Sequence, residues 1–166
     1  MGTNDLTLRV ADGMFNYRVG AVIIDAGEVL MVRNNGDSHY YTVGGRIQFG
    51  ESAQEAILRE AFEETQIELE IDRLAFIHEN FFTMGSSGKP FHELCFFFLL
   101  KQNKRLREMK HDFFEEAYGD VLLHWLPLDK LENYPMYPLF FKTELLNLPN
   151  RTKYLITRDD ITVQVM

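Results

Sequence analysis

The chain has 166 residues, of which 46% are hydrophobic and 13% aromatic. This composition is typical of a folded globular protein, and the length predicts a single domain over residues 1–166. The formal net charge of −8, with no basic stripe to offset it, argues against binding to nucleic-acid polymers or to membranes. A small polyanionic substrate fits such a charge only if divalent cations bridge the two.

Cellular location is read from the cysteine content and from the apolar segments. The first ten residues, MGTNDLTLRV, contain no apolar signal region, and the longest apolar run, residues 94–100, is too short to span a bilayer. The single cysteine, Cys95, excludes an intramolecular disulfide and fits a reducing compartment. Its setting, LCFFFLL, predicts a buried strand and a structural thiol. We therefore expect a cytoplasmic protein.

The first part of the chain is rich in strand signals. Apolar residues alternate over residues 6–10, ahead of a turn at Asp12-Gly13, and a second turn at Asp25-Ala26-Gly27 joins two β-rich runs. A loop, NNGDS, then precedes a short strand that leads into the paired glycines Gly44-Gly45. The strands predicted here cover residues 6–10, 17–24, 28–33 and 40–43.

The clearest helix begins after Gly50. Ser52 is a favourable N-cap, and Glu55, three residues later, completes a capping box. The face opposite the core carries the acidic residues, and Ala53 and Ala56 are expected to extend that face towards the N-terminus, where small side chains leave room for a ligand. The predicted core-facing residues are Ile57, Leu58, Ala61 and Phe62.

The second half of the chain predicts a long hairpin, a charged segment and a terminal hairpin. Residues 74–83 and 92–101 are expected to form antiparallel strands joined by the flexible loop GSSGKP. Residues 102–119 are charged and irregular, with one turn of helix expected at Phe113–Tyr118. The remaining predicted elements are a strand at 121–126, a helix at 139–146 and a hairpin formed by 154–157 and 161–165.

Three carboxylates lie close together near the end of the predicted helix. Glu60, Glu63 and Glu64 directly follow Arg59, and spacings of three and four residues place all three on one helix face. Like charges at this spacing repel, and the negative end of the helix dipole disfavours them further. A bound cation would relieve both effects, so the pattern indicates a metal site.

The stretch from Gly45 to Ile67, GRIQFGESAQEAILREAFEETQI, resembles the signature of the Nudix hydrolases. That signature runs Gly, five residues, Glu, seven residues, Arg-Glu, an apolar residue, any residue, Glu-Glu, any residue, Gly and an apolar residue. Every charged position is present at the matching spacing. The one departure is Gln66, where the family usually has Gly, and we expect Gln66 to take a left-handed conformation that only slightly alters the helix exit.

The resemblance implies an α/β (α+β) fold, an α/β/α sandwich around a mixed β-sheet. It also implies hydrolysis of the pyrophosphate linkage in a nucleoside diphosphate joined to another moiety. Carboxylate ligands favour Mg²⁺ or Mn²⁺. The metal ligands implied for this chain are Glu60, Glu63, Glu64 and the main-chain carbonyl of Gly44. Arg59 and Glu51 are implied to orient the loop and the helix by pairing with carboxylates.

The sequence does not identify the general base. Family members use a motif glutamate or an acid on a distant loop, and Glu63 or Glu64 is our first choice. One position for the distant acid precedes the tryptophan, where this chain has His124. Histidine titrates near neutral pH, but it is equally compatible with an ordinary strand position. Nearby loop candidates are Glu115, Glu116 and Asp120.

Substrate contacts are expected at Gly45 and Arg46 in the loop of the signature, and at Phe82, which could stack on a nucleobase. Glu93 is a possible auxiliary metal ligand. The Pro or Tyr that marks family members acting on ADP-ribose or on dinucleoside polyphosphates is absent around Phe81-Phe82-Thr83. A nucleoside triphosphate or a nucleotide sugar therefore stays open. The cations considered for phosphate binding are Arg18, Arg33, Arg46 and Lys89.

Two other classes of function are weighed against the enzyme. A nucleotide-sensing or partner-binding module would keep the fold without turnover, but the complete glutamate set argues against a silent descendant. A third hypothesis is an acidic α+β domain that binds proteins through its aromatic surface. The expected partner is a nucleotide-derived small molecule. A monomer and a homodimer are both compatible with the sequence, because a strand at either end of the chain could pair across a dimer.

Overall fold

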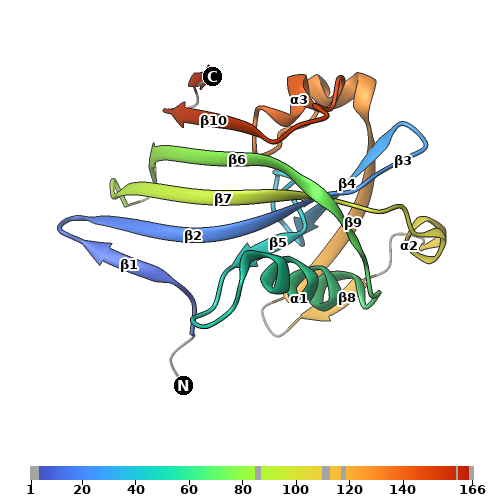
Figure 1. Ribbon diagram of the computed structural model, residues 1–166, viewed down its shortest axis with the longest axis horizontal. Coiled ribbons are helices and arrows are strands. Elements are labelled where there is room, and N and C mark those ends of the chain that lie inside the picture. The colour runs from blue at the N-terminus through green and yellow to red at the C-terminus, as the bar shows by residue number, and fades with distance from the viewer. Residues whose placement is uncertain (1–3, 85–86, 110–112, 117–118, 160, 165–166) are drawn as a thin grey trace.

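The structure is a computed structural model that describes residues 4–84, 87–109, 113–116, 119–159 and 161–164 (Figure 1). Its helices are α1 (Ala53–Thr65), α2 (Lys104–Glu108), the 3₁₀ helix η1 (Leu128–Asn133) and α3 (Phe141–Glu144). The strands of the larger sheet are β1 (Thr7–Val10), β2 (Gly13–Val22), β5 (Gly44–Arg46), β6 (Ile71–Thr83), β7 (Pro90–Leu100), β10 (Lys153–Arg158) and β11 (Ile161–Gln164). The smaller sheet contains β3 (Ile24–Asp25), β4 (Glu28–Asn34), β8 (Phe113–Glu116) and β9 (Gly119–Pro127).

The larger sheet is mixed, with strand order β1-β2-β7-β6-β10-β11 and β5 paired to β2. The predicted hairpins are confirmed: β1 with β2, β3 with β4, β6 with β7, and β10 with β11 are all antiparallel. Two parallel pairings, β2 with β7 and β10 with β6, join these hairpins into one sheet. The predicted mixed α+β fold is therefore confirmed, and the smaller sheet is a second layer of strands beside it.

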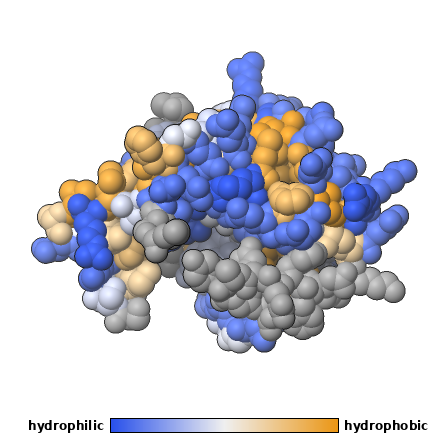
Figure 2. All heavy atoms as spheres, turned by 90° about the horizontal axis from the view of Figure 1, so that it is seen from below, coloured by the Kyte–Doolittle hydropathy of each residue, from blue (hydrophilic) through white to orange (hydrophobic). Residues whose placement is uncertain are grey.

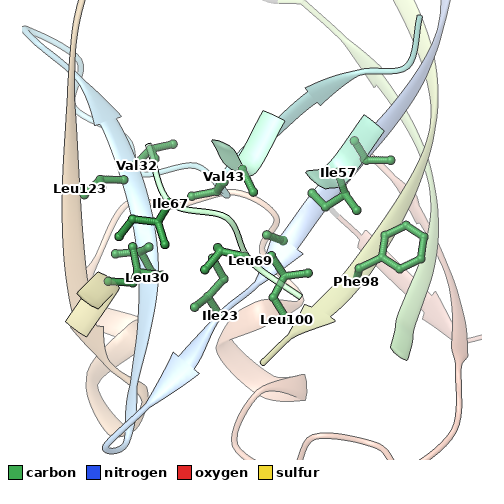
Figure 3. Packing of buried hydrophobic residues seen from close by; sticks show 14 of the residues in the cluster. Ile23, Leu30, Val32, Val43, Ile57, Ile67, Leu69, Phe98, Leu100 and Leu123 are labelled. Carbon is green, nitrogen blue, oxygen red and sulfur yellow. The ribbon is translucent and has the colours of Figure 1, made fainter. Parts of the chain in front are cut away.

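Two groups of buried side chains hold the layers together. The first cluster includes Ile57 of α1, Phe98 and Leu100 of the larger sheet, and Leu30 and Leu123 of the smaller sheet (Figure 3). The second lies on the opposite face of the larger sheet and is dominated by aromatic rings. Its largest members are Phe76, Phe97, Phe140 and Phe141. We call the two faces of the larger sheet the α1 face and the α3 face.

The predicted capping box of α1 is present, but its buried stripe differs from the expectation. The Ser52 side chain accepts from the Glu55 amide, and the Glu55 side chain accepts from the Ser52 amide. Leu58 and Phe62, expected in the core, are 37% and 44% exposed. Ala56, expected on the acidic face, is fully buried. The helix is rotated because its contact with β5 draws acidic residues towards the sheet.

Three other elements differ from the sequence-based expectation. Residues 40–43 form no regular strand; Tyr40 and Tyr41 make isolated bridges, and regular pairing begins at Gly44. The segment Phe113–Tyr118, expected to be helical, is strand over Phe113–Glu116, while residues 117 and 118 lie outside the described part of the chain. The helix expected at 139–146 is shorter, and α2 was not foreseen. At Phe113–Glu116, pairing with β9 outweighs a weak local helical signal.

Burial also accounts for Cys95. The side chain lies inside the larger sheet, and burial raises the pKa of its thiol to about 12, as expected for a structural cysteine. Among the helices that the structure describes, none combines the length and the apolar content that a membrane crossing requires.

Candidate active site

The candidate site is built where β5 meets α1. Gly44 has φ of 143°, and a Cβ there would lie 2.3 Å from the carbonyl oxygen of Val19. A Cβ on Gly45 would lie 2.5 Å from the carboxylate of Glu60. No side chain fits at either position without displacement, so the two glycines bring the β5 backbone directly against the acidic part of the helix.

Two of the three motif glutamates are partly or fully withdrawn from solvent. Glu64 is 8% exposed, and its Oε1 accepts a hydrogen bond of 2.9 Å from the Gly44 amide. The side chain of Glu60 is 15% exposed and faces Gly45. The third, Glu63, is half exposed. The helix thus presents two carboxylates to β5 and one to solvent.

Arg59 is the centre of the ionic network. Its Nε and Nη2 donate to the two oxygens of Glu51, at 2.8 and 3.0 Å, in a bidentate pair. Its Nη1 donates to Glu60 at 2.7 Å and to Glu63 at 3.2 Å, and Nη2 also donates to the Arg46 carbonyl at 3.1 Å. The expected pairing of Arg59 with carboxylates is present. The Arg59 guanidinium neutralises part of the negative charge for which the sequence predicted a bound cation.

Glu51 holds the loop that precedes the helix. Besides the bidentate pair with Arg59, its Oε2 accepts the Gln48 amide at 2.9 Å. The hydrogen bonds from Arg59 are the main reason why the pKa of Glu51 lies below its ordinary value. A charged Glu51 therefore fixes both the loop and the guanidinium that neutralises the motif glutamates.

The residues present fit a hard divalent cation by the chemistry of their donors. Carboxylate oxygens and a backbone carbonyl are the ligands that Mg²⁺ and Mn²⁺ prefer. The glycine at position 45 leaves the space into which the Glu60 carboxylate projects. In the described part of the chain, no three His, Cys, Asp or Glu side chains are already gathered around one point. Cation binding would therefore compete with Arg59 for Glu60 and Glu63.

Two arginines lie beside this site. In the pairing of β2 with β5, Arg18 stands opposite Arg46, one position from the pair Val19 and Gly45. Arg18 is 3.5 Å from Glu93, and its charge also interacts with that of Glu60. Arg46 is 3.9 Å from Asp5. The two side chains are 38% and 44% exposed. Their adjacency was not predictable, because the sequence does not reveal the register between these strands.

Other predicted positions lie away from the cluster. Phe82 stacks on Phe91 of β7 with ring centroids 5.2 Å apart. Gly45 pairs with Val19, and Val19 pairs with Phe96, which lies five residues from Phe91 along β7. Five strand residues span about 16 Å. His124 lies on β9 of the smaller sheet, edge-on to Tyr40. The side chains of the loop candidates, residues 115, 116 and 120, lie outside the described part of the structure.

Glu93 belongs to a polar network that the sequence did not reveal. Its Oε1 accepts from the Asn16 amide group at 2.8 Å, and the Thr7 hydroxyl donates to Asn16 at 3.0 Å. Asn16 is almost completely buried, and Asn16 pairs with Glu93 in the ladder between β2 and β7. The network fixes the carboxylate that contacts Arg18. An isolated Asn between Phe15 and Tyr17 gives no sequence signal for this role.

Comparison with known proteins agrees with this geometry. A family model described as the NUDIX domain matches residues 14–143. The chain belongs to the Nudix family. It is accordingly a pyrophosphohydrolase, an enzyme that acts on acid anhydrides. No curated protein matches the sequence significantly.

Several solved structures share the fold at low sequence identity. A MutT protein from Bacillus halodurans is 22% identical with a TM-score of 0.62, over 86% of this chain and 89% of that one. A UDP-X diphosphatase is 19% identical with a TM-score of 0.57, over 90% and 69%. An ADP-ribose pyrophosphatase from Streptococcus suis is 16% identical with a TM-score of 0.54, over 87% and 98%. At these identities the likeness establishes the fold alone.

Proposed function

We propose that this protein hydrolyses the pyrophosphate linkage of a small nucleotide, a nucleoside diphosphate joined to a further phosphate or to a sugar, with Mg²⁺ or Mn²⁺ as cofactor. The observation that carries this proposal is the placement of Glu60 and Glu64 against Gly44-Gly45, beside the bidentate pair of Arg59 and Glu51. Related folds named for nucleotide-derived substrates support the general class.

The metal ligands in this proposal are Glu60, Glu63, Glu64 and the Gly44 carbonyl. When bound, the cation supplies neutralisation of phosphate charge and polarises the phosphorus under attack. Arg59 donates to both Glu60 and Glu63, whose spacing of three residues places them on the same side of the helix. Glu51 keeps Arg59 in place.

Arg18 and Arg46 are the proposed phosphate-binding residues. They stand opposite each other between β2 and β5, and alternation directs both side chains to the face opposite Val19 and Gly45; Arg18 is still close enough to Glu60 for the two charges to interact. A guanidinium presents a fork of N–H donors that matches phosphate oxygens. The overall charge of −8 makes such a local pair of cations useful for holding a polyanion. Phe82 is not included, because it lies along the sheet from this cluster.

Proton removal from the attacking water is assigned to Glu63. Its side chain is half exposed, so water reaches it from solvent. Glu64 is buried and already accepts the Gly44 amide. His124 lies on the other sheet against Tyr40, which makes it the weaker candidate.

The proposal is tested by product release from a panel of nucleoside triphosphates, nucleotide sugars, ADP-ribose and dinucleoside polyphosphates, with Mg²⁺, with Mn²⁺ and with chelator. We expect one class to be turned over, chelator to abolish the reaction, and Glu64→Gln to reduce kcat at least about 100-fold, as for loss of a group that acts in the transition state. Glu68→Gln, an exposed glutamate just past the helix, is the matched control and should leave kcat unchanged.

Two outcomes would contradict the assignment. Nucleotide binding by calorimetry without turnover of any class would favour the silent sensing module. Failure of the wild type to bind Mg²⁺ or Mn²⁺ would favour a protein-binding domain. Thermal melting of Glu64→Gln distinguishes a catalytic role of Glu64 from a structural one, because a variant that no longer folds would show that Glu64 is structural.

A further inference from the structure

A row of polar side chains crosses the α3 face of the larger sheet. Its members stand opposite one another in the strand ladders, in the order Thr7, Asn16, Glu93, Asn80 and Thr157. The row therefore runs over β1, β2, β7, β6 and β10, which Figure 1 shows side by side. We call these five residues the polar row.

The polar row is withdrawn from solvent, unlike the polar side chains of a strand surface that simply faces water. Asn16 is 1% exposed, Thr157 is 6% exposed and the Glu93 side chain is 15% exposed. Burial of such groups costs free energy unless they are hydrogen-bonded. Asn16 bridges Thr7 and Glu93, and Thr157 shares a hydrogen bond with His78. These bonds hold the row in a fixed geometry.

Two members of the row have hydrogen-bonding groups that are not used within the described residues. The Asn80 side chain and Glu93 Oε2 have no partner there, whereas Glu93 Oε1 accepts from Asn16. A carboxylate has about four acceptor sites, and a side-chain amide carries both donors and an acceptor. Because Glu93 and Asn80 stand directly opposite each other, their Cβ atoms are about 5 Å apart. The pair can thus accept N–H donors at one point and donate to a carbonyl oxygen at the next.

Aromatic rings border the polar row on both sides. Phe82 and Phe91 are the next residues on the same face towards the strand tips, and their rings stack with centroids 5.2 Å apart. Figure 2 shows hydrophobic surface at its left end, where Figure 1 places these tips. On the other side, His78 meets Phe140 edge to face with ring centroids 4.9 Å apart. A planar ring with a polar edge suits such a surface, because phenyl rings stack on its faces while the polar row meets its edge.

The polar row lies within reach of a substrate that is held at the candidate active site. Along β2, four residues separate the partner of Gly44 from the partner of Glu93, about 13 Å. Arg18 stands between them, 3.5 Å from Glu93, and its charge also interacts with that of Glu60. A nucleotide whose phosphates contact Arg18 can therefore place its base on the polar row.

We propose that the polar row binds the base of the nucleotide substrate and that this base is guanine, an inference that rests on the proposed function. Guanine presents two neighbouring N–H groups, N1–H and the 2-amino group, beside the O6 carbonyl. Glu93 accepts from both N–H groups, and the Asn80 amide donates to O6. Adenine, cytosine and uracil lack this pair of neighbouring donors, and uracil would also place carbonyl oxygens against the carboxylate.

Calorimetric titration of the wild type with GMP, IMP, AMP and UMP, each with Mg²⁺, tests the proposal. A nucleoside monophosphate contains no acid anhydride, so binding is measured whether or not the protein is a hydrolase. GMP should bind at least about tenfold more tightly than AMP or UMP, which is the discrimination that a good bidentate contact to a base provides. IMP, which lacks only the 2-amino group, should bind more weakly than GMP.

Two variants test the assigned residues. Glu93→Gln still accepts from Asn16 but turns an N–H donor towards guanine, so it should lower the preference for GMP over AMP about tenfold. Comparing two nucleotides on one protein cancels any effect of the lost charge on phosphate binding. Asn80→Leu should also lower the preference, because O6 loses its donor. Asp72→Asn, which removes a half-exposed carboxylate near the start of β6, is the control and should leave the preference unchanged.

Far-ultraviolet circular dichroism of each variant confirms that the fold is retained. Equal affinity for GMP, IMP and AMP overturns the proposal, as does the absence of GMP binding or a guanine preference that is unchanged in both Glu93→Gln and Asn80→Leu. A guanine preference that both variants lose supports the site even if no nucleotide is hydrolysed. Hydrolysis of nucleotides with equal kcat/KM for every base would leave the proposed function standing and overturn this inference alone.

Discussion

Gly45 is the residue on which the geometry of the candidate site depends most directly. Its backbone conformation is one that other residues adopt, so flexibility is not the reason for glycine here. The reason is space: a Cβ would lie 2.5 Å from each carboxylate oxygen of Glu60. A glycine in the signature therefore reserves the volume that an acidic side chain of the helix uses.

Gly45→Ala should weaken Mg²⁺ binding at least about tenfold, because Glu60 must leave its position beside β5, and ligand displacements of this kind cost 10- to 100-fold in affinity. Calorimetric titration measures the change. Gly36→Ala is the control: φ there is 84° with open space around it, so the substitution should lower stability by about 1 kcal/mol and leave metal affinity unchanged. Equal metal affinity in both variants would show that Glu60 does not depend on the space at Gly45.

Gln66 shows how a departure from the family pattern is accommodated. It has φ of 55° and ψ of 24°, the left-handed conformation expected for this position. Its side-chain amide donates to the carbonyls of Phe62 and Glu63, at 3.3 and 3.0 Å. The Phe62 carbonyl also accepts the Gln66 backbone amide at 2.8 Å, and the side chain gives the Glu63 carbonyl a partner. These bonds offset the roughly 1 kcal/mol penalty of the left-handed conformation for a residue with a Cβ. The helix exit is therefore kept without glycine.

At the scale of the element, α1 determines where the acidic residues lie. Its N-terminus is fixed by the reciprocal bonds of Ser52 and Glu55, and its C-terminal half carries the ligands proposed for the metal. The buried residues Ile57 and Ala61 hold the helix against both sheets. Anything that frays the first turn acts on the whole helix.

Ser52→Ala should lower the free energy of unfolding by about 1 kcal/mol, since it leaves the Glu55 amide without its acceptor. For a chain of this length the melting temperature should fall by roughly 2–4 °C, which scanning calorimetry measures. Ser52→Asp keeps an acceptor and places a negative charge at the positive end of the helix dipole, so it should match the wild type or exceed it. A loss in Ser52→Asp equal to that in Ser52→Ala would argue against capping as the cause.

At the scale of the whole molecule, a buried histidine joins the terminal hairpin to the rest of the sheet. His78 of β6 is 5% exposed and shares a hydrogen bond of 2.8 Å with Thr157 of β10. Burial lowers the pKa of His78 from 6.5 to about 4. The folded protein therefore keeps this side chain neutral where the unfolded chain would protonate it.

Stability should fall as the pH is lowered from about 6.5 to about 4, because the unfolded state binds the extra proton in that window. The contribution of His78 amounts to about 3 kcal/mol over the whole window. Urea unfolding at pH 7 and at pH 4.5 measures it, and His78→Gln should lose much less stability between these two values than the wild type loses. An equal loss in both proteins would place the pH dependence on other groups.

Features that depend on neighbours along the chain were predictable from the amino-acid sequence. The capping box, the helix at 53–65 and the hairpins follow from residues a few positions apart, whose contacts local geometry fixes. The spacing of Glu51, Arg59, Glu60, Glu63 and Glu64 indicated the family on the same basis.

The way in which distant segments meet became evident only in the folded structure. Alternation shows that a strand has two faces, but it does not show which strand lies beside it or in what register, so the parallel pairing of β2 with β7 was not predictable. The same limit hid the adjacency of Arg18 and Arg46 and the bond between His78 and Thr157. It also explains the exposure of Leu58 and Phe62, because helical periodicity marks an apolar stripe, whereas the contact with β5 sets the rotation of the helix.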